Sequence, residues 1–117
     1  MHRALILARI VPDSEQEVAA IFAASDRTEL PRVVGVRHRS LYRLGDLYAH
    51  LVETEQRGED AIDAARVHPE FAAVSARLCP YITPYLPTWR SPRDAQAQCF
   101  YLWEPGGGEP EPGGELP

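Results

Sequence analysis

The sequence predicts an α+β protein of the ferredoxin-like, split βαβ type, in which a four-stranded antiparallel sheet carries its helices on one face. Three observations predict this class. The expected elements follow the order strand, helix, strand, strand, helices, strand; a two-residue loop that begins with glycine joins two of the strands; and 117 residues suffice for one domain but not for two ordinary ones. No apolar run approaches the roughly 20 residues that span a bilayer, and no signal-peptide core is complete, so we expect a cytoplasmic protein.

The first strand and the first helix are expected before residue 26. An apolar run predicts a strand over residues 3–11. Asp13 can cap the helix that follows, and Gln16 three residues later would complete a capping box. The helix is expected to run to about Ser25, and residues at spacings of three, four and seven mark its inward face: Val18, Ile21, Phe22 and Ser25. Asp26 falls on the flank of that face, so a polar pair ends a buried helix face.

The next two strands form a hairpin whose turn sets the pairing. Strands are expected over residues 33–44 and 47–54, and the turn Gly45-Asp46 suits a type II′ hairpin. Directly opposed residues project from the same side of a sheet, so one side carries Arg39, Leu41, Arg43, Tyr48, His50 and Val52. The other carries His38, Ser40, Tyr42, Leu47, Ala49, Leu51 and Glu53. Arg39 and His50 therefore become diagonal neighbours on one surface.

The second half of the chain is expected to cover this sheet. Helices are predicted from Ala61 to about Arg66 and from Pro69 onward, the second with an inward stripe of Phe71, Val74, Ser75 and Leu78. A Pro- and aromatic-rich wrap over 80–96 precedes a last strand over 98–103. The domain then ends near residue 104, because 105–117 hold nine Gly or Pro residues and are expected to be disordered. The outer face of the sheet is too apolar to remain exposed to solvent, and burial of this face between two copies favours a two-fold homodimer.

Composition excludes several classes of function. The chain has no lysine, so a Schiff-base or P-loop lysine is excluded, and a net charge of −5 argues against nucleic-acid binding. The four histidines show no metal-ligand spacing and no dinucleotide fingerprint follows a strand, so we expect neither a metal nor an organic cofactor. Cys79 and Cys99 are expected to be small buried residues rather than reactive thiols.

Two interpretations of the inward-facing polar residues remain open at this level. In one, Arg39 and Asp26 form a structural ion pair, and His50 is a core histidine whose hydrogen bonds are satisfied and which has no catalytic role. In the other they form an acid–base site, in which His50 titrates near neutrality and moves protons. Arg39 would then stabilise an enolate or alkoxide oxygen, and Asp26 would hold one of the two in place.

The same residues lie in blocks that resemble the aromatic polyketide cyclases of the tetracenomycin cyclase type. The blocks are Ser25-Asp26-Arg27-Thr28-Glu29-Leu30-Pro31, Gly35-Val36 with Arg39 and Leu41, Asp46-Leu47-Tyr48-Ala49-His50-Leu51, His68-Pro69-Glu70-Phe71, Tyr81 to Tyr85, Trp89-Arg90-Ser91-Pro92, Asp94-Ala95, and Phe100-Tyr101 to Trp103-Glu104. The resemblance covers about residues 1–104. It implies a homodimeric ferredoxin-like barrel of bacterial type II polyketide biosynthesis, working without cofactors and beside other synthase components.

What the resemblance implies is closure of a late ring of a partly cyclised poly-β-ketone by aldol-type condensation and loss of water, a lyase-type reaction in antibiotic or pigment biosynthesis. It implies His50, Arg39 and Asp26 as catalytic residues. Ser25, where some members have a histidine, would orient the substrate, together with Tyr48, Phe22 and, at the mouth of the cavity, Arg43. Two alternatives are a cofactor-free monooxygenase acting on anthrones and a non-catalytic module that binds a polyketide intermediate.

Overall fold

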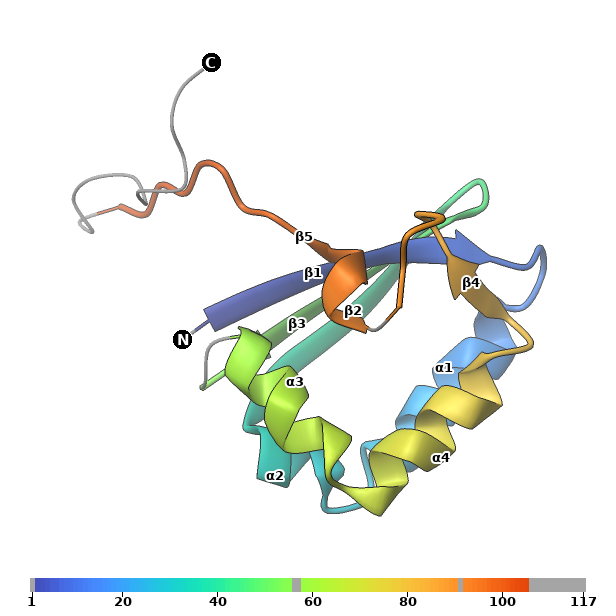
Figure 1. The fold of residues 1–117 in the computed structure, drawn as a ribbon, viewed down its shortest axis with the longest axis horizontal. Coiled ribbons are helices and arrows are strands. Elements are labelled where there is room, and N and C mark those ends of the chain that lie inside the picture. Colours follow the sequence, from blue (N-terminus) through green and yellow to red (C-terminus); the bar gives the residue numbers. More distant parts are fainter. Residues whose placement is uncertain (1, 56–57, 91, 106–117) are drawn as a thin grey trace.

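A computed structural model describes residues 2–55, 58–90 and 92–105. The elements in chain order are β1 (His2–Ile10), α1 (Glu15–Ser25), α2 (Leu30–Val34), β2 (Val36–Leu44), β3 (Leu47–Thr54), α3 (Gly58–Arg66), α4 (Pro69–Leu78), β4 (Ile82–Pro84), the 3₁₀ helix η1 (Pro92–Ala95) and β5 (Gln96–Ala97). Figure 1 shows these α-helices together on one face of a twisted sheet. In the described part of the chain no helix is both long and apolar enough to cross a membrane.

The sheet confirms the predicted ferredoxin-like class. Its strands follow the order β2-β3-β1-β4, and every pairing is antiparallel. The prediction of four strands becomes five because two short strands share one edge of β1. There β4 pairs with residues 8–10, and β5 pairs with Leu5 and Ile6.

The hairpin confirms the predicted register. Arg39 pairs with Val52, Leu41 with His50, and Arg43 with Tyr48. Gly45 has φ 60°, in the left-handed region, whereas Asp46 keeps a negative φ, and this combination fits a type II′ turn. Along β3 the inward side chains are buried and the outward ones half-buried. The face that carries Tyr48, His50 and Val52 therefore packs toward the helices, as the alternation in the sequence predicts.

The predicted capping box at the start of α1 is wrong. Asp13 lies in the left-handed region with φ 63°, and the N-cap is Ser14, which makes no side-chain cap hydrogen bond. Instead the Ser14 hydroxyl donates to the Val11 carbonyl at 2.6 Å, closing the turn that leaves β1. The helix still ends at Ser25 as predicted, and its buried side chains are Val18, Phe22 and Ser25.

A short helix, α2, stands where the second strand was expected to begin. Pro31 occupies its first turn, and Gly35 ends it with φ 80°, its N–H donating to the carbonyls of Pro31 and Arg32. Both residues are favourable at these positions because proline needs no N–H there and glycine tolerates a positive φ. The strand therefore begins at Val36.

The C-terminal part departs from expectation in its last strand. Helix α4 begins at Pro69, and the His68 Nδ1 atom caps it by accepting from the Glu70 N–H at 3.1 Å. The last strand is Gln96–Ala97 rather than 98–103, because only those two residues reach the edge of β1 that β4 leaves free. The chain beyond leaves the body of the domain (Figure 1), and three aromatic side chains there are exposed: Phe100, Tyr101 and Trp103.

Two further expectations concern the cysteines and the tail. Cys79 and Cys99 are both exposed, so the expectation that they are buried is wrong: one follows the end of α4 and the other lies on the departing segment. The predicted disorder of the tail concerns residues 105–117, of which 106–117 lie outside the described residues.

Candidate active site

A cavity of about 440 Å³ lies between the sheet and the helices. Its walls come from β1, β2, β3 and β4, from all four α-helices, and from residues 89 and 90 of the wrap. Most of the lining is apolar, and the polar exceptions include Ser25, Arg39, Tyr48, His50, Thr54 and Arg90. The volume falls in the range of about 300–1,000 Å³ that is usual for small-molecule sites.

Asp26 holds Arg39 from the outer side of this wall. The Arg39 Nε atom donates to both carboxylate oxygens at 3.1 and 3.0 Å, and Nη2 donates to Oδ1 at 2.8 Å. The Asp26 side chain is 39% exposed and lies on an outer groove, whereas Arg39 is 15% exposed and lines the cavity. A two-pronged, charge-assisted contact of this kind fixes the plane of the guanidinium.

The third nitrogen of that guanidinium meets His50. Arg39 Nη1 lies 3.0 Å from His50 Nε2. A guanidinium can only donate, so Nε2 accepts and the imidazole proton resides on Nδ1. Burial, and secondly the charge of Arg39, lowers the pKa of His50 from 6.5 to about 3. The expectation that His50 titrates near neutrality is therefore wrong: its side chain is buried and stays neutral.

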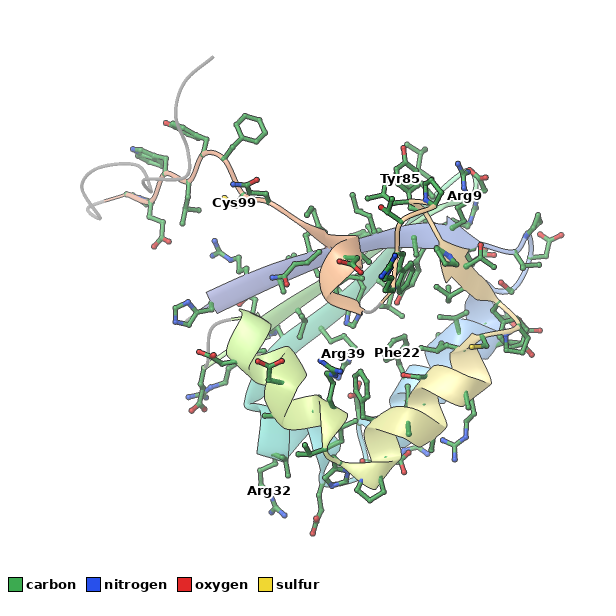
Figure 2. The ribbon with its side chains drawn as sticks, viewed as in Figure 1. Arg9, Phe22, Arg32, Arg39, Tyr85 and Cys99 are labelled. Atoms are coloured by element: carbon green, nitrogen blue, oxygen red, sulfur yellow. The ribbon has the colours of Figure 1, made fainter. Side chains whose placement is uncertain are left out.

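Aromatic rings hold these two side chains against the core. The Arg39 guanidinium carbon lies 5.0 Å from the centre of the Phe22 ring, and the Phe22 and His50 rings meet edge to face at 5.0 Å. Figure 2 shows Arg39 and Phe22 in the space between sheet and helices. The ring centres of Tyr48 and His50 are 6.3 Å apart. Burial raises the pKa of the Tyr48 hydroxyl, and the positive charge of Arg39 offsets part of that rise. Tyr48 thus remains a neutral phenol that can donate a hydrogen bond.

The structure brings together most of the residues predicted for the site. Ser25, Phe22 and Tyr48 line the cavity beside Arg39 and His50. Arg43 does not line it: its Nε pairs with Glu15 Oε2 at 3.1 Å, and its Nη1 donates to the Gly45 carbonyl at 3.0 Å. The position of Arg43 at the mouth of the cavity is therefore wrong, because the acidic first turn of α1 draws it to the surface.

Two polar residues of the lining were missed. Thr54 is 1% exposed and continues the inward alternation of β3, so the period of two could have identified it. Arg90 lies in the wrap after β4, where no periodicity indicates the direction of a side chain. Among the residues that the structure describes, no group of three histidine, cysteine or acidic side chains could hold a metal ion.

The model of the polyketide synthesis cyclase family matches residues 2–104. The chain belongs to this family. It is 50% identical to polyketide synthase CurG of Streptomyces cyaneus over 89% of this chain and 98% of that protein. It is 43% identical to tetracenomycin F2 cyclase of Streptomyces glaucescens over 87% of this chain and 94% of that protein.

The solved structure of tetracenomycin F2 cyclase, described as a type-II polyketide cyclase, superposes with a TM-score of 0.81 at 42% identity. The superposition covers 89% of this chain and 98% of that one. An uncharacterized protein of Streptomyces coelicolor is 49% identical over 89% of this chain and 96% of its own length. The protein is therefore an enzyme of the type II polyketide cyclase family.

Proposed function

We propose that this cyclase closes a late ring of a partly cyclised poly-β-ketone by aldol-type condensation followed by loss of water. One observation carries the proposal: a guanidinium that touches both a carboxylate and a neutral imidazole forms part of the wall of an apolar cavity. The cavity excludes bulk water from the reacting carbons, and the two nitrogen groups can act on oxygen and hydrogen during the condensation.

The condensation starts with carbon–carbon bond formation. An enolised carbon between two carbonyl groups attacks a ketone carbon of the same molecule, and the ketone π electrons move to the ketone oxygen. The enol proton is transferred to that oxygen, which becomes a hydroxyl group. Arg39 donates from Nη1 to that developing oxyanion while Asp26 keeps the guanidinium plane in place. No electrons leave the substrate, so the step needs no oxidant or reductant.

Binding of the substrate oxygen to Arg39 also activates His50. When the substrate oxygen replaces Nε2 as the acceptor of Arg39 Nη1, the imidazole lone pair becomes free and a negative charge approaches it. Both changes raise the affinity of Nε2 for a proton. His50 can then take the remaining proton from the attacking carbon, whose C–H electrons form the new carbon–carbon double bond. The proton is returned to the hydroxyl group, which leaves as water. A neutral imidazole in the free enzyme is the form that this first transfer requires.

The remaining predicted residues position the substrate. The Ser25 hydroxyl and the neutral Tyr48 phenol can hydrogen-bond substrate oxygens, and Phe22 offers a flat apolar surface. Much of the acceleration would come from folding a reactive chain into one conformer in which the two carbons meet. We therefore expect loss of His50 or Arg39 to cost about 10²–10³-fold in rate, the usual range for one acid–base or oxyanion group.

We also propose that the cyclase works as a homodimer formed by the outer sheet face. That face carries apolar side chains from three strands: Leu5, Leu7, Tyr42, Leu44, Leu47 and Leu51. Tyr42 is 58% and Leu44 79% exposed in the single chain. Isologous pairing of this face with a second copy would remove the patch from water.

The experiment that tests the function adds purified protein to a partly cyclised polyketide intermediate, with and without oxygen, and identifies the products by mass spectrometry. We expect a product that has lost the elements of water, formed equally well without oxygen. Oxygen uptake would indicate the monooxygenase instead. Product patterns that depend on the protein but not on its cavity residues would indicate a binding module.

Variants connect the reaction to the site. His50→Ala and Arg39→Ala should each slow ring closure or change which ring forms, whereas Arg77→Ala, an exposed arginine of α4 outside the cavity, should do neither. The assignment is wrong if both cavity variants keep the rate and the ring pattern of the unmodified enzyme.

A further inference from the structure

The charges around the cavity are unbalanced. The chain carries 17 acidic residues against 12 basic ones. Even so, no carboxylate among the described residues lines the cavity, which instead contains two arginines, Arg39 and Arg90, and the neutral His50. The charge of Arg39 is matched by Asp26 from outside. The charge of Arg90 has no acidic partner among the residues that the structure describes.

The described surroundings of Arg90 offer its guanidinium no acidic side chain to pair with. Its backbone N–H donates to Asp94 Oδ2 at 2.8 Å, so the nearby carboxylate is used on the main chain. Its guanidinium forms no salt bridge within the described part of the molecule. By contrast, Arg9, Arg43 and Arg77, which lie outside the cavity, all pair with acidic side chains.

The backbone around Arg90 is held in place. The preceding residue, Trp89, packs against the apolar cluster of Ala8, Val18 and Phe22, and its N–H donates to the Leu86 carbonyl at 3.1 Å. Together with the Asp94 contact to the N–H of Arg90 itself, this holds the main chain at residues 89 and 90. Arg90 is exposed to solvent and also lines the cavity, so it lies where a bound molecule would meet water.

We propose that Arg90 binds a free carboxylate of the polyketide substrate while the fused rings occupy the apolar cavity. The inference rests on the proposed function, since it takes an aromatic polyketide as the occupant. An arginine fork matches a carboxylate in two-pronged geometry, and an apolar cavity that contains a spare positive charge favours an anion over a neutral ester. Arg90 thereby sets specificity for the released acid over a carrier-bound thioester, whose carbonyl has no charge.

Binding of a simple fused-ring acid tests this without turnover. The probes are anthraquinone-2-carboxylate and its methyl ester, titrated calorimetrically into the full-length protein. We expect the unmodified enzyme to bind the acid about tenfold more tightly than the ester, which corresponds to one charge-assisted contact at a partly exposed site. Arg90→Gln should weaken acid binding about tenfold and leave ester binding unchanged, and added salt should weaken only the acid complex of the unmodified enzyme.

Two matched variants complete the design. Arg90→Lys keeps the charge but not the fork and should retain part of the preference for the acid. Arg77→Gln removes an exposed arginine on the outer side of α4 and should change neither affinity. Equal losses for acid and ester in Arg90→Gln, no loss in that variant, or the same loss in Arg77→Gln would each overturn the proposal.

The outcomes separate this inference from the function on which it rests. If the unmodified enzyme binds acid and ester equally, the cavity accepts fused rings but Arg90 does not select the carboxylate, and only this inference fails. Tighter binding of the ester would favour a carrier-borne substrate. If neither probe binds, the assignment of the cavity to an aromatic polyketide fails together with the role of Arg90.

Discussion

Acidification from about pH 7 to about pH 5 should remove about 2 kcal/mol of folding stability that depends on His50 alone. The pKa of its imidazole is about 3 in the fold and 6.5 in the unfolded chain. Because the folded value is the lower one, the unfolded state binds the proton first as the pH falls. The contribution of His50 is therefore complete above about pH 6.5 and declines by up to about 1.4 kcal/mol per unit toward pH 3.

The groups around His50 explain why it resists protonation. Arg39 on β2 donates to Nε2, Phe22 on α1 covers one edge of the ring, and the neutral Tyr48 lies beside it on β3. None of these groups supplies a negative charge, and the carboxylate of Asp26 already forms a salt bridge with Arg39. A proton on His50 would thus be buried next to a guanidinium.

Urea unfolding at the two pH values, followed by tryptophan fluorescence at one fixed protein concentration, measures the effect. His50→Gln keeps an oxygen that can accept from Arg39 but does not titrate in this range, so its unfolding free energy should fall about 2 kcal/mol less than that of the unmodified protein. His2→Gln, at an exposed position, should behave like the unmodified protein. The same pH dependence in His50→Gln and the unmodified protein would refute the reasoning.

Three other changes have expected outcomes. Phe22→Leu should cost about 1–2 kcal/mol in chemical unfolding, because it keeps apolar volume but removes the ring that contacts Arg39 and His50; an unchanged midpoint would show that the ring contributes nothing. Asp26→Asn should change the unfolding free energy by less than about 1 kcal/mol, since the carboxylate is partly exposed, yet lower kcat about tenfold by freeing the guanidinium, and unaltered kcat would contradict that role. Tyr42→Arg should convert a dimer to a monomer in light scattering, and a dimer that persists would place the interface elsewhere.

Local rules of the chain were enough for the hairpin and for the inward face of α1. A glycine-first turn permits one register, and a period of two then places Arg39 and His50 on the same side of the sheet. A helical period likewise places Ser25 next to Phe22 in the cavity. These features need only the geometry of neighbouring residues, so they could be predicted before any tertiary contact was known.

Two predictions, the capping box at Asp13 and the strand beginning at residue 33, were wrong because the sequence there favours more than one local structure. Asp13 and Gln16 have the spacing of a capping box, but the turn out of β1 requires a positive φ at Asp13 and leaves Ser14 as the N-cap. Pro31 and Gly35 are favourable helix ends, yet the β-branched residues between them favoured a strand. In each case the local sequence is compatible with two structures, and packing against the rest of the domain selects one of them.

The chemical state of the site was decided only by the tertiary structure. The sequence by itself determined that an arginine, a histidine and an aspartate could meet, because turn type and periodicity are properties of short segments. It could not determine that His50 is neutral, that Arg43 pairs with Glu15, or that Arg90 reaches the cavity without an acidic partner. Desolvation and charge pairing depend on every element that surrounds a group, and those elements come from distant parts of the chain.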